Sequence, residues 1–184
     1  MANLVKKKNL DLVLDIAKDL PLLKFIVVGE GPEKNYLLDR VKNEKLLNVQ
    51  IFGYIKSTEL YSFYYQSDIF LLTSIKEGTP TAMLEAMACG LPIVTSGAGG
   101  VERILGSHNY VVNINDKQQF IDSISTLLGD AQLMQKISDS FDSIKNNSKM
   151  IMNIADRVEN VKEDLGRVSS KGDSENVIGN LKNI

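Results

Sequence analysis

Short apolar runs alternate with longer amphipathic segments over most of the chain. Several runs are largely apolar at successive positions and rich in β-branched residues: Lys24–Gly29, Asn48–Gly53, Asp68–Thr73, Leu91–Thr95 and Tyr110–Val112. A run that is apolar on both faces is typical of a parallel strand that is covered by helices on both sides. The pattern therefore predicts strands of a mostly parallel sheet.

The segments between these runs carry apolar residues at helical spacing. The predicted helix faces are Leu10, Val13, Leu14 and Ala17; Tyr36, Leu37, Val41 and either Leu46 or Leu47; and Ile121, Ile124, Leu127 and Leu128. Shorter helices are predicted over Thr58–Gln66, with Ser57 as its cap, and over Thr81–Cys89, with Gly90 just past its end. Because strands and helices alternate, we expect an α/β fold.

The pattern changes after Gly129. A helical stripe follows at Leu133, Ile137, Phe141 and Ile144, and a heptad-like seam then runs over Ile151–Val168. We divide the chain into a domain over 1–129, whose first strand is expected to be partly missing, C-terminal helices over 130–168 and a short tail over 169–184. The seam is typical of a terminal helix that packs on its own domain, which we favour, or of a helix whose partner is another domain or chain.

Composition narrows the class of protein. The 184 residues include 21 basic and 23 acidic side chains, and a net charge of -2 argues against a nucleic-acid-binding surface. One cysteine (Cys89) and one histidine (His108) exclude an internal disulfide and a Cys/His metal cluster. The longest apolar runs are about five residues, far below the roughly 20 that span a bilayer. Because the N-terminal lysines precede no apolar core, we expect no signal peptide and a cytoplasmic protein.

Two glycine-rich turns raise the question of a dinucleotide site. Gly29–Lys34 follows a strand and opens a helix, but it lacks the third glycine, and Pro32 removes an amide donor. Gly97–Gly100 also has the wrong spacing. We interpret both as sharp turns at strand ends and rank an unrelated NAD-binding domain last.

Ser74–Pro92 carries a more specific pattern. Gly78 allows a tight bend, Thr79 is expected as the N-cap of the following helix, and Pro80 fits its first position. The amides of about Thr79–Ala82 would then point out of the carboxyl end of the strand. A diphosphate bound there gains hydrogen bonds and the positive end of the helix dipole.

Two carboxylates flank this helix start. Glu77 precedes the helix, and Glu85 lies on the same helix face as Thr81. Carboxylate oxygens accept protons from sugar hydroxyls, so the spacing suits a ribose on one side of a diphosphate and a transferred hexose on the other. Two glutamates at this separation also occur by chance. The pair is therefore informative only together with the motif around it: a strand, Glu77–Pro80, the helix, and then Gly90–Pro92.

With these motifs the chain resembles the C-terminal, donor-binding half of retaining GT-B glycosyltransferases of the group 1 (GT4) family. The resemblance covers about residues 3–128. The matching motifs are Lys8-Asn9-Leu10, Phe25–Pro32, Val49–Tyr54, Glu59-Leu60, Tyr64–Asp68, the Glu77-to-Glu85 E-x7-E motif, Gly90–Pro92 and Gly99–Glu102. It implies a Rossmann-like parallel sheet sandwiched by helices, with additional C-terminal helices.

The resemblance assigns roles to single positions. It implies that Lys8 neutralises the departing diphosphate and that Glu77 binds the transferred sugar, and it makes these two the catalytic residues. The other donor-binding positions that it implies are Tyr54, Ile55, Gly78, Thr79, Pro80, Thr81 and Glu85. Among them, Thr81 and the helix start would hold phosphate, Glu85 the ribose, and Tyr54 and Ile55 the base. The family is metal-independent, so no cofactor is expected.

The resemblance also implies partners and a pathway. The donor would be a UDP-, GDP- or ADP-linked sugar, and the acceptor-binding N-terminal half would come from outside this chain. We expect a role in surface polysaccharide or glycolipid synthesis, with peripheral membrane association of the complete enzyme left open, and no turnover by the chain alone. One departure is that the family usually carries an arginine near the position of Asn3 or Ala2, where this chain has none; either Lys6 and Lys7 replace it or a phosphate contact is lost. The alternative is a truncated or non-catalytic nucleotide-sugar-binding module that needs a partner chain.

Overall fold

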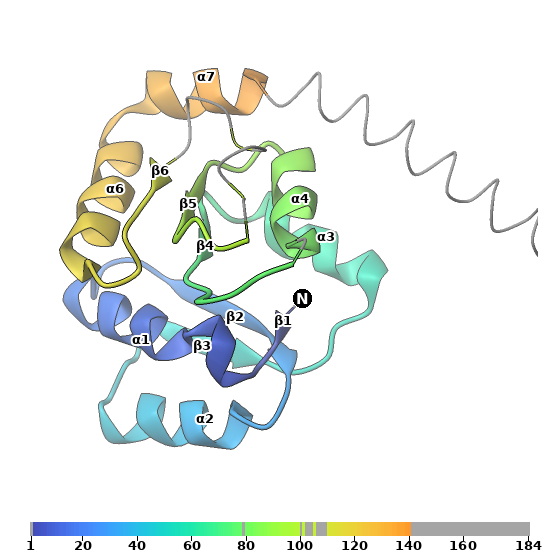
Figure 1. Cartoon of the computed structure of the whole chain (residues 1–184), viewed down its shortest axis with the longest axis vertical. Helices are drawn as coiled ribbons and strands as arrows, with labels where there is room; N and C mark the ends of the chain where they lie inside the picture. Colours follow the sequence, from blue (N-terminus) through green and yellow to red (C-terminus); the bar gives the residue numbers. More distant parts are fainter. Residues whose placement is uncertain (1, 79, 100, 102–104, 106–109, 141–184) are drawn as a thin grey trace, which may run out of the picture. The chain divides into compact units, whose positions relative to one another are not determined.

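Strands and helices alternate along the chain in a computed structural model that describes residues 2–78, 80–99, 101, 105 and 110–140 (Figure 1). The strands are β1 (Ala2–Asn3), β2 (Phe25–Glu30), β3 (Val49–Phe52), β4 (Phe70–Leu72), β5 (Ile93–Thr95) and β6 (Tyr110–Val111). The helices are the 3-10 helix η1 (Lys6–Lys8), α1 (Leu10–Asp19), α2 (Lys34–Asn43), α3 (Ser57–Tyr65), α4 (Thr81–Ala88), α6 (Lys117–Gly129) and α7 (Ala131–Ser140). The predicted α/β alternation is confirmed.

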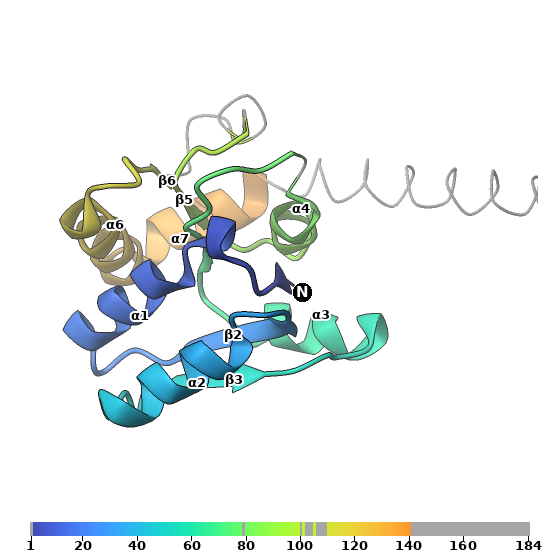
Figure 2. The same ribbon diagram turned by 60° about the horizontal axis from the view of Figure 1, so that its bottom comes forward.

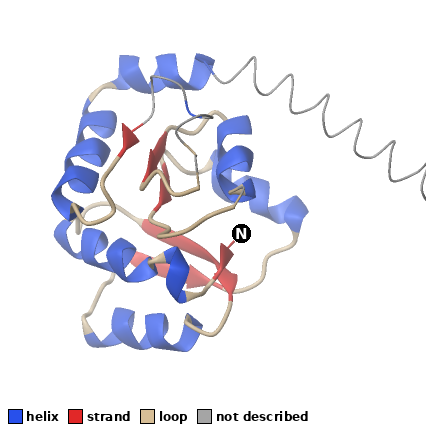
Figure 3. Ribbon diagram, viewed as in Figure 1, coloured by secondary structure: helices blue, strands red, loops and turns tan. Residues whose placement is uncertain are grey.

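All strand pairings are parallel, as predicted, but they form two ladders. One has the order β1-β2-β3 and the other β4-β5-β6, and the two groups of strands are separate in Figure 3. Two-residue β1 pairs only with Gly29 and Glu30, at the carboxyl end of β2. A cavity of about 350 Å³ is lined in part by residues of β2 and by Phe70 and Leu71 of β4.

The predicted apolar face of α1 is confirmed. Leu14 and Ala17 are buried in one cluster with Leu37 and Val49. Figure 2 shows α1 near α2 and β3, the elements that carry these two partners. The predicted face of α2 is wrong at one position, because the Tyr36 side chain is exposed. After α2, Lys45 adopts a left-handed backbone conformation with φ 54°, and the turn buries Leu46 while leaving Leu47 96% exposed.

The larger core lies around the β4-β5-β6 ladder. Helices α4 and α6 lie on opposite sides of these strands in Figure 1 and contribute Met83, Met87, Phe120 and Leu127. Full burial of each such side chain contributes about 1.5–3 kcal/mol to folding. Asp116 caps α6 by accepting a hydrogen bond from the Gln119 amide at 2.9 Å. This core supports the loops that follow β4 and β5.

Helix ends depart from the predicted caps at two places. Helix α3 begins at Ser57 itself, and Lys56 holds the N-cap position. Helix α4 begins at Thr81 and has Pro80 at the N-cap, because Pro80 has a non-helical ψ of 82°. The expectation that Pro80 is the first helical residue is therefore wrong, and Thr79 lies outside the described residues. Gly90 follows the end of α4 with φ 79°, as predicted.

The C-terminal region is described only as far as α7. Ile137 of the predicted stripe is buried there, whereas Phe141, Ile144 and the seam over 151–168 lie outside the described residues, as does the tail over 169–184. Within the described ranges, no helix combines the length and apolarity that crossing a membrane requires.

Candidate functional site

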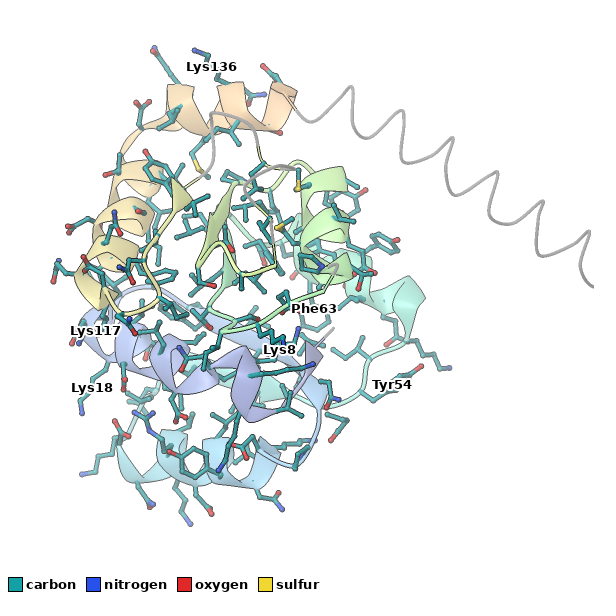
Figure 4. The ribbon with its side chains drawn as sticks, viewed as in Figure 1. Lys8, Lys18, Tyr54, Phe63, Lys117 and Lys136 are labelled. Atoms are coloured by element: carbon teal, nitrogen blue, oxygen red, sulfur yellow. The ribbon has the colours of Figure 1, made fainter. Side chains whose placement is uncertain are left out.

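Hydrogen bonds join the loop after β1 to the loop after β4. The Thr73 hydroxyl, at the end of β4, lies 3.0 Å from the carbonyl oxygens of both Lys8 and Asn9. The Ile75 amide donates to the Lys7 carbonyl at 2.8 Å. Because both strands end at the same edge of the fold, these bonds bring Lys8 beside the segment that carries Glu77 (Figure 4 labels Lys8).

Lys8 and Glu77, the two predicted catalytic residues, form an ion pair. Lys8 Nζ lies 2.5 Å from Glu77 Oε1, and the side chains are 19% and 7% exposed. The hydroxyl of Ser74 donates to the same carboxylate oxygen, also at 2.5 Å. The site thus holds a partly buried cation and a buried carboxylate in contact, and Ser74 adds a neutral donor.

The loop after β5 contacts the segment that carries Glu77. The Ser96 hydroxyl donates to the Ser74 carbonyl at 2.5 Å. Gly99 has φ 78°, and a Cβ atom at this position would lie only 2.5 Å from the Glu77 carbonyl oxygen. Glycine is therefore required here both for its left-handed conformation and for the close approach of the two loops.

Helix α4 begins four residues after Glu77, and its first amides have no acceptor within the helix. The first amide to donate to the Pro80 carbonyl is that of Met83, at 2.9 Å. The amides of Thr81 and Ala82 precede it and cannot have an intrahelical acceptor, and Thr81 is exposed. A Cβ atom at Gly78 would meet open space. An anion at this helix end would gain both amide donors and the helix dipole.

Glu85 is held by a different group from Glu77. The Tyr64 hydroxyl donates to Glu85 Oε2 at 2.8 Å and lies 3.3 Å from the Ala82 carbonyl oxygen. Burial, followed by the hydrogen bond to the carboxylate, raises the pKa of the Tyr64 phenol. The phenol therefore keeps its proton, and its hydrogen bond to Glu85, to a higher pH than an ordinary tyrosine would. Glu85 is half-buried on α4.

Tyr54 and Ile55 lie in the loop between β3 and α3. Figure 4 shows Tyr54 apart from Lys8, and its side chain is 66% exposed, while Ile55 is half-buried. The Tyr54 amide donates to Glu30 Oε1 at 3.1 Å. Lys34 binds the same oxygen at 2.6 Å and is the main reason that the pKa of Glu30 is lowered. The loop is thus anchored to the end of β2.

Three supporting residues were not predicted as part of the site: Ser74, Ser96 and Tyr64. Ser96 directly follows β5, and Ser74 follows β4 after one residue; this position after an apolar strand is the signal that marks each serine as a candidate for the site. Tyr64 gives no comparable signal, because an aromatic residue on a helix is usually a core residue. No group of three or more His, Cys, Asp or Glu side chains in the described part of the chain could hold a metal ion.

Known proteins share this arrangement of strands and helices. The family of group 1 glycosyl transferases matches residues 1–141. One subunit of the phosphatidylinositol N-acetylglucosaminyltransferase of Homo sapiens is 34% identical over 111 residues, 57% of this chain and 23% of the human protein. The crystal structure of the C-terminal domain of LpcC, a glycosyl transferase group 1 family protein from Francisella tularensis, has a TM-score of 0.69 and 26% identity; the match covers 80% of this chain and 82% of that one.

HepE from Anabaena, solved in complex with UDP, has a TM-score of 0.72 and 21% identity, and the match covers 87% of this chain and 47% of that one. These fold matches confirm the predicted Rossmann-like α/β architecture. The chain spans about a quarter of the length of the curated relatives that it matches. Because the family match covers well over half of its residues, the chain belongs to the group 1 glycosyl transferase family.

Proposed function

We propose that the chain is the donor-binding half of a glycosyltransferase and that it binds a nucleotide sugar beside Lys8, Glu77 and the start of α4. The contact between Lys8 and Glu77 carries this proposal. It joins a cation suited to a diphosphate and a carboxylate suited to sugar hydroxyls, next to free helix amides. The match to HepE, which was solved with UDP, supports a nucleotide as the ligand.

The proposed mechanism is electrostatic. Negative charge grows on the diphosphate as its bond to the sugar breaks, and Lys8 together with the Thr81 and Ala82 amides would stabilise that charge. Glu77 would orient the transferred sugar, and Glu85 the ribose. Tyr54 and Ile55 would lie near the base. The reaction proposed is retaining hexosyl transfer without a metal, completed by an acceptor-binding half outside this chain.

We further propose that the complete enzyme acts in the cytoplasm, in the synthesis of a surface polysaccharide or a glycolipid. The human relative is named for transfer to phosphatidylinositol, and other relatives are named for O-antigen and teichuronic acid biosynthesis. These names support an acceptor that is a lipid or a growing polysaccharide. The binding experiment described next identifies the base and the sugar of the donor.

Isothermal titration calorimetry of the 184-residue chain with UDP-, GDP- and ADP-sugars tests the proposal. We expect one nucleotide class to bind, and Glu85→Ala to weaken that binding. Failure of every nucleotide sugar to bind at millimolar concentration would overturn it. The family's metal independence predicts that EDTA leaves the binding unchanged.

A second candidate, a non-catalytic nucleotide-sugar-binding module, is favoured by Asn3 at the end of β1. The resemblance implies an arginine near Asn3 or Ala2, and neither residue is a cation, so the diphosphate would lose one cationic partner. Sugar transfer by this chain, once it is combined with a family acceptor-binding half, would exclude this candidate. Binding of the donor without transfer would favour it.

A further inference from the structure

Oxygen Oε1 of Glu77 accepts hydrogen bonds from two donors, Lys8 Nζ and Ser74 Oγ, each at 2.5 Å. The Glu77 side chain is 7% exposed, and Ser74 is 1% exposed. Water therefore has little access to this oxygen. A buried carboxylate loses its hydration, and hydrogen-bond donors from the protein must replace it.

The two donors differ in how they are held. Ser74 is three residues from Glu77, and its own carbonyl accepts the hydrogen bond from Ser96. Lys8 reaches the carboxylate from a loop 69 positions away, through a long side chain that can rotate. Ser74 therefore stays beside Glu77 when Lys8 changes partner.

Under the proposed function, Lys8 has a second anionic partner, the diphosphate of the donor. When a bare nucleoside diphosphate attracts Lys8, the Glu77 carboxylate loses that hydrogen-bond donor. The ligand supplies no other donor to replace it. A nucleotide sugar also attracts Lys8, although it carries about one negative charge fewer because its terminal phosphate is esterified, and it brings sugar hydroxyls that donate to Glu77. The carboxylate must then be held where those hydroxyls arrive, and Ser74 is the described side chain placed to hold it.

We propose that Ser74 is a positioning residue: it fixes Glu77 for the sugar hydroxyls and makes the site prefer a nucleotide sugar to the matching bare nucleoside diphosphate. This inference rests on the proposed function and deepens it. Ser74 acts through Glu77 and is not assigned a contact with the substrate.

Calorimetry with matched ligand pairs tests the inference on the full chain. The pairs are UDP-N-acetylglucosamine with UDP, GDP-mannose with GDP, and ADP-glucose with ADP. The quantity of interest is the ratio of the two Kd values within a pair. Loss of a hydrogen bond to a charged group predicts that Ser74→Ala lowers this preference for the sugar form by about tenfold. Ser74→Thr keeps the hydroxyl and should restore the preference.

Ser62→Ala is the matched control, because Ser62 is an exposed serine of α3 whose hydroxyl donates to the Glu59 carbonyl at 2.6 Å. It should leave the ratio unchanged. If Ser74→Ala fails to fold, Ser96→Ala, which removes the bond to the Ser74 carbonyl, should lower the preference in the same direction.

The outcomes separate this inference from the function on which it rests. If no pair binds to the unmodified chain, the proposed function fails and the inference falls with it. If nucleotides bind without preference for the sugar form, the inference alone is overturned. It is equally overturned if folded Ser74→Ala keeps the preference or weakens both members of a pair by the same factor, as a merely structural role would.

Discussion

The phenol of Tyr64 donates a hydrogen bond to Glu85 Oε2 at 2.8 Å and so links α3 to α4. Tyr64 is buried, and its ring also packs against those of Tyr61 and Phe70. The phenol therefore cannot reorient freely, and the hydrogen bond restricts the Glu85 carboxylate. In the proposed site this orients Glu85 for the ribose before the donor arrives.

Tyr64→Phe should weaken binding of the nucleotide found by the calorimetric screen. Loss of one hydrogen bond to a carboxylate predicts a Kd about tenfold higher. Without that bond, part of the free energy of nucleotide binding would be used to order the Glu85 side chain. Tyr65→Phe is the control, since Tyr65 is a neighbouring, exposed tyrosine. An unchanged Kd for Tyr64→Phe would show that the bond does not prepare Glu85.

Alkaline pH should reduce the free energy of unfolding through Tyr64. Its pKa in the folded chain is raised above the ordinary value of 10.0, so above that pH the unfolded chain loses a proton that the folded chain retains. The contribution of Tyr64 to the free energy of unfolding is fully present below pH 10. Above pH 10 it falls by up to about 1.4 kcal/mol per pH unit. Urea unfolding between pH 8 and 11 measures this slope, and Tyr64→Phe should make it shallower. Equal slopes for the two chains would contradict the assignment.

Lys8→Met should destabilise the empty chain because it leaves the buried Glu77 carboxylate without its cation. We expect the free energy of unfolding to fall by about 1–3 kcal/mol, and Glu77→Gln in the same chain to restore part of it. Urea unfolding of both single variants and the double variant measures the coupling. Strictly additive effects would show that the ion pair contributes nothing.

Lys34→Met provides the comparison for this experiment. It breaks the ion pair with Glu30, whose side chain is 52% exposed. An exposed pair of this kind contributes about 0–1 kcal/mol, so the expected loss is smaller than that for Lys8. A loss as large as that of Lys8→Met would mean that burial does not distinguish the two pairs.

Gly99→Ala should disturb the site although Gly99 is not expected to touch the substrate. The new methyl group would approach the Glu77 carbonyl oxygen to 2.5 Å in a backbone conformation that alanine disfavours. We expect a loss of about 2–3 kcal/mol in the free energy of unfolding and weaker donor binding. Gly129→Ala at the end of α6 is the control, because a methyl group there meets nothing within 4 Å. Thermal unfolding and calorimetry distinguish the two variants.

The strands and helices of this fold were predictable because their buried positions are apolar and recur at the spacing of a strand or a helix. The sequence runs around Val27, Ile51 and Val94 predicted parallel strands, and each forms one. The division into two ladders was not predictable, since hydrophobic patterning says which faces are buried but not how far one strand reaches along its neighbour.

Part of the candidate site was also predictable. The resemblance brought Lys8 and Glu77 into one site, and the structure shows them in contact. Thr79 lies outside the described residues, and Thr81, Tyr54 and Ile55 stay predictions as donor ligands. The position of Ser74 after a strand marked it as a candidate for the site, but its hydrogen bond to Glu77 depends on the conformation of the loop that holds both residues, which hydrophobic spacing does not encode.

The hydrogen bonds of Thr73 have a consequence for the dynamics of the site. Its hydroxyl shares one proton between two carbonyls of the segment that carries Lys8, while its backbone continues toward Glu77. Opening of either loop therefore breaks bonds that belong to the other, so the two segments form one cooperative opening unit. The positive and negative charges then leave their working positions together and regain them together.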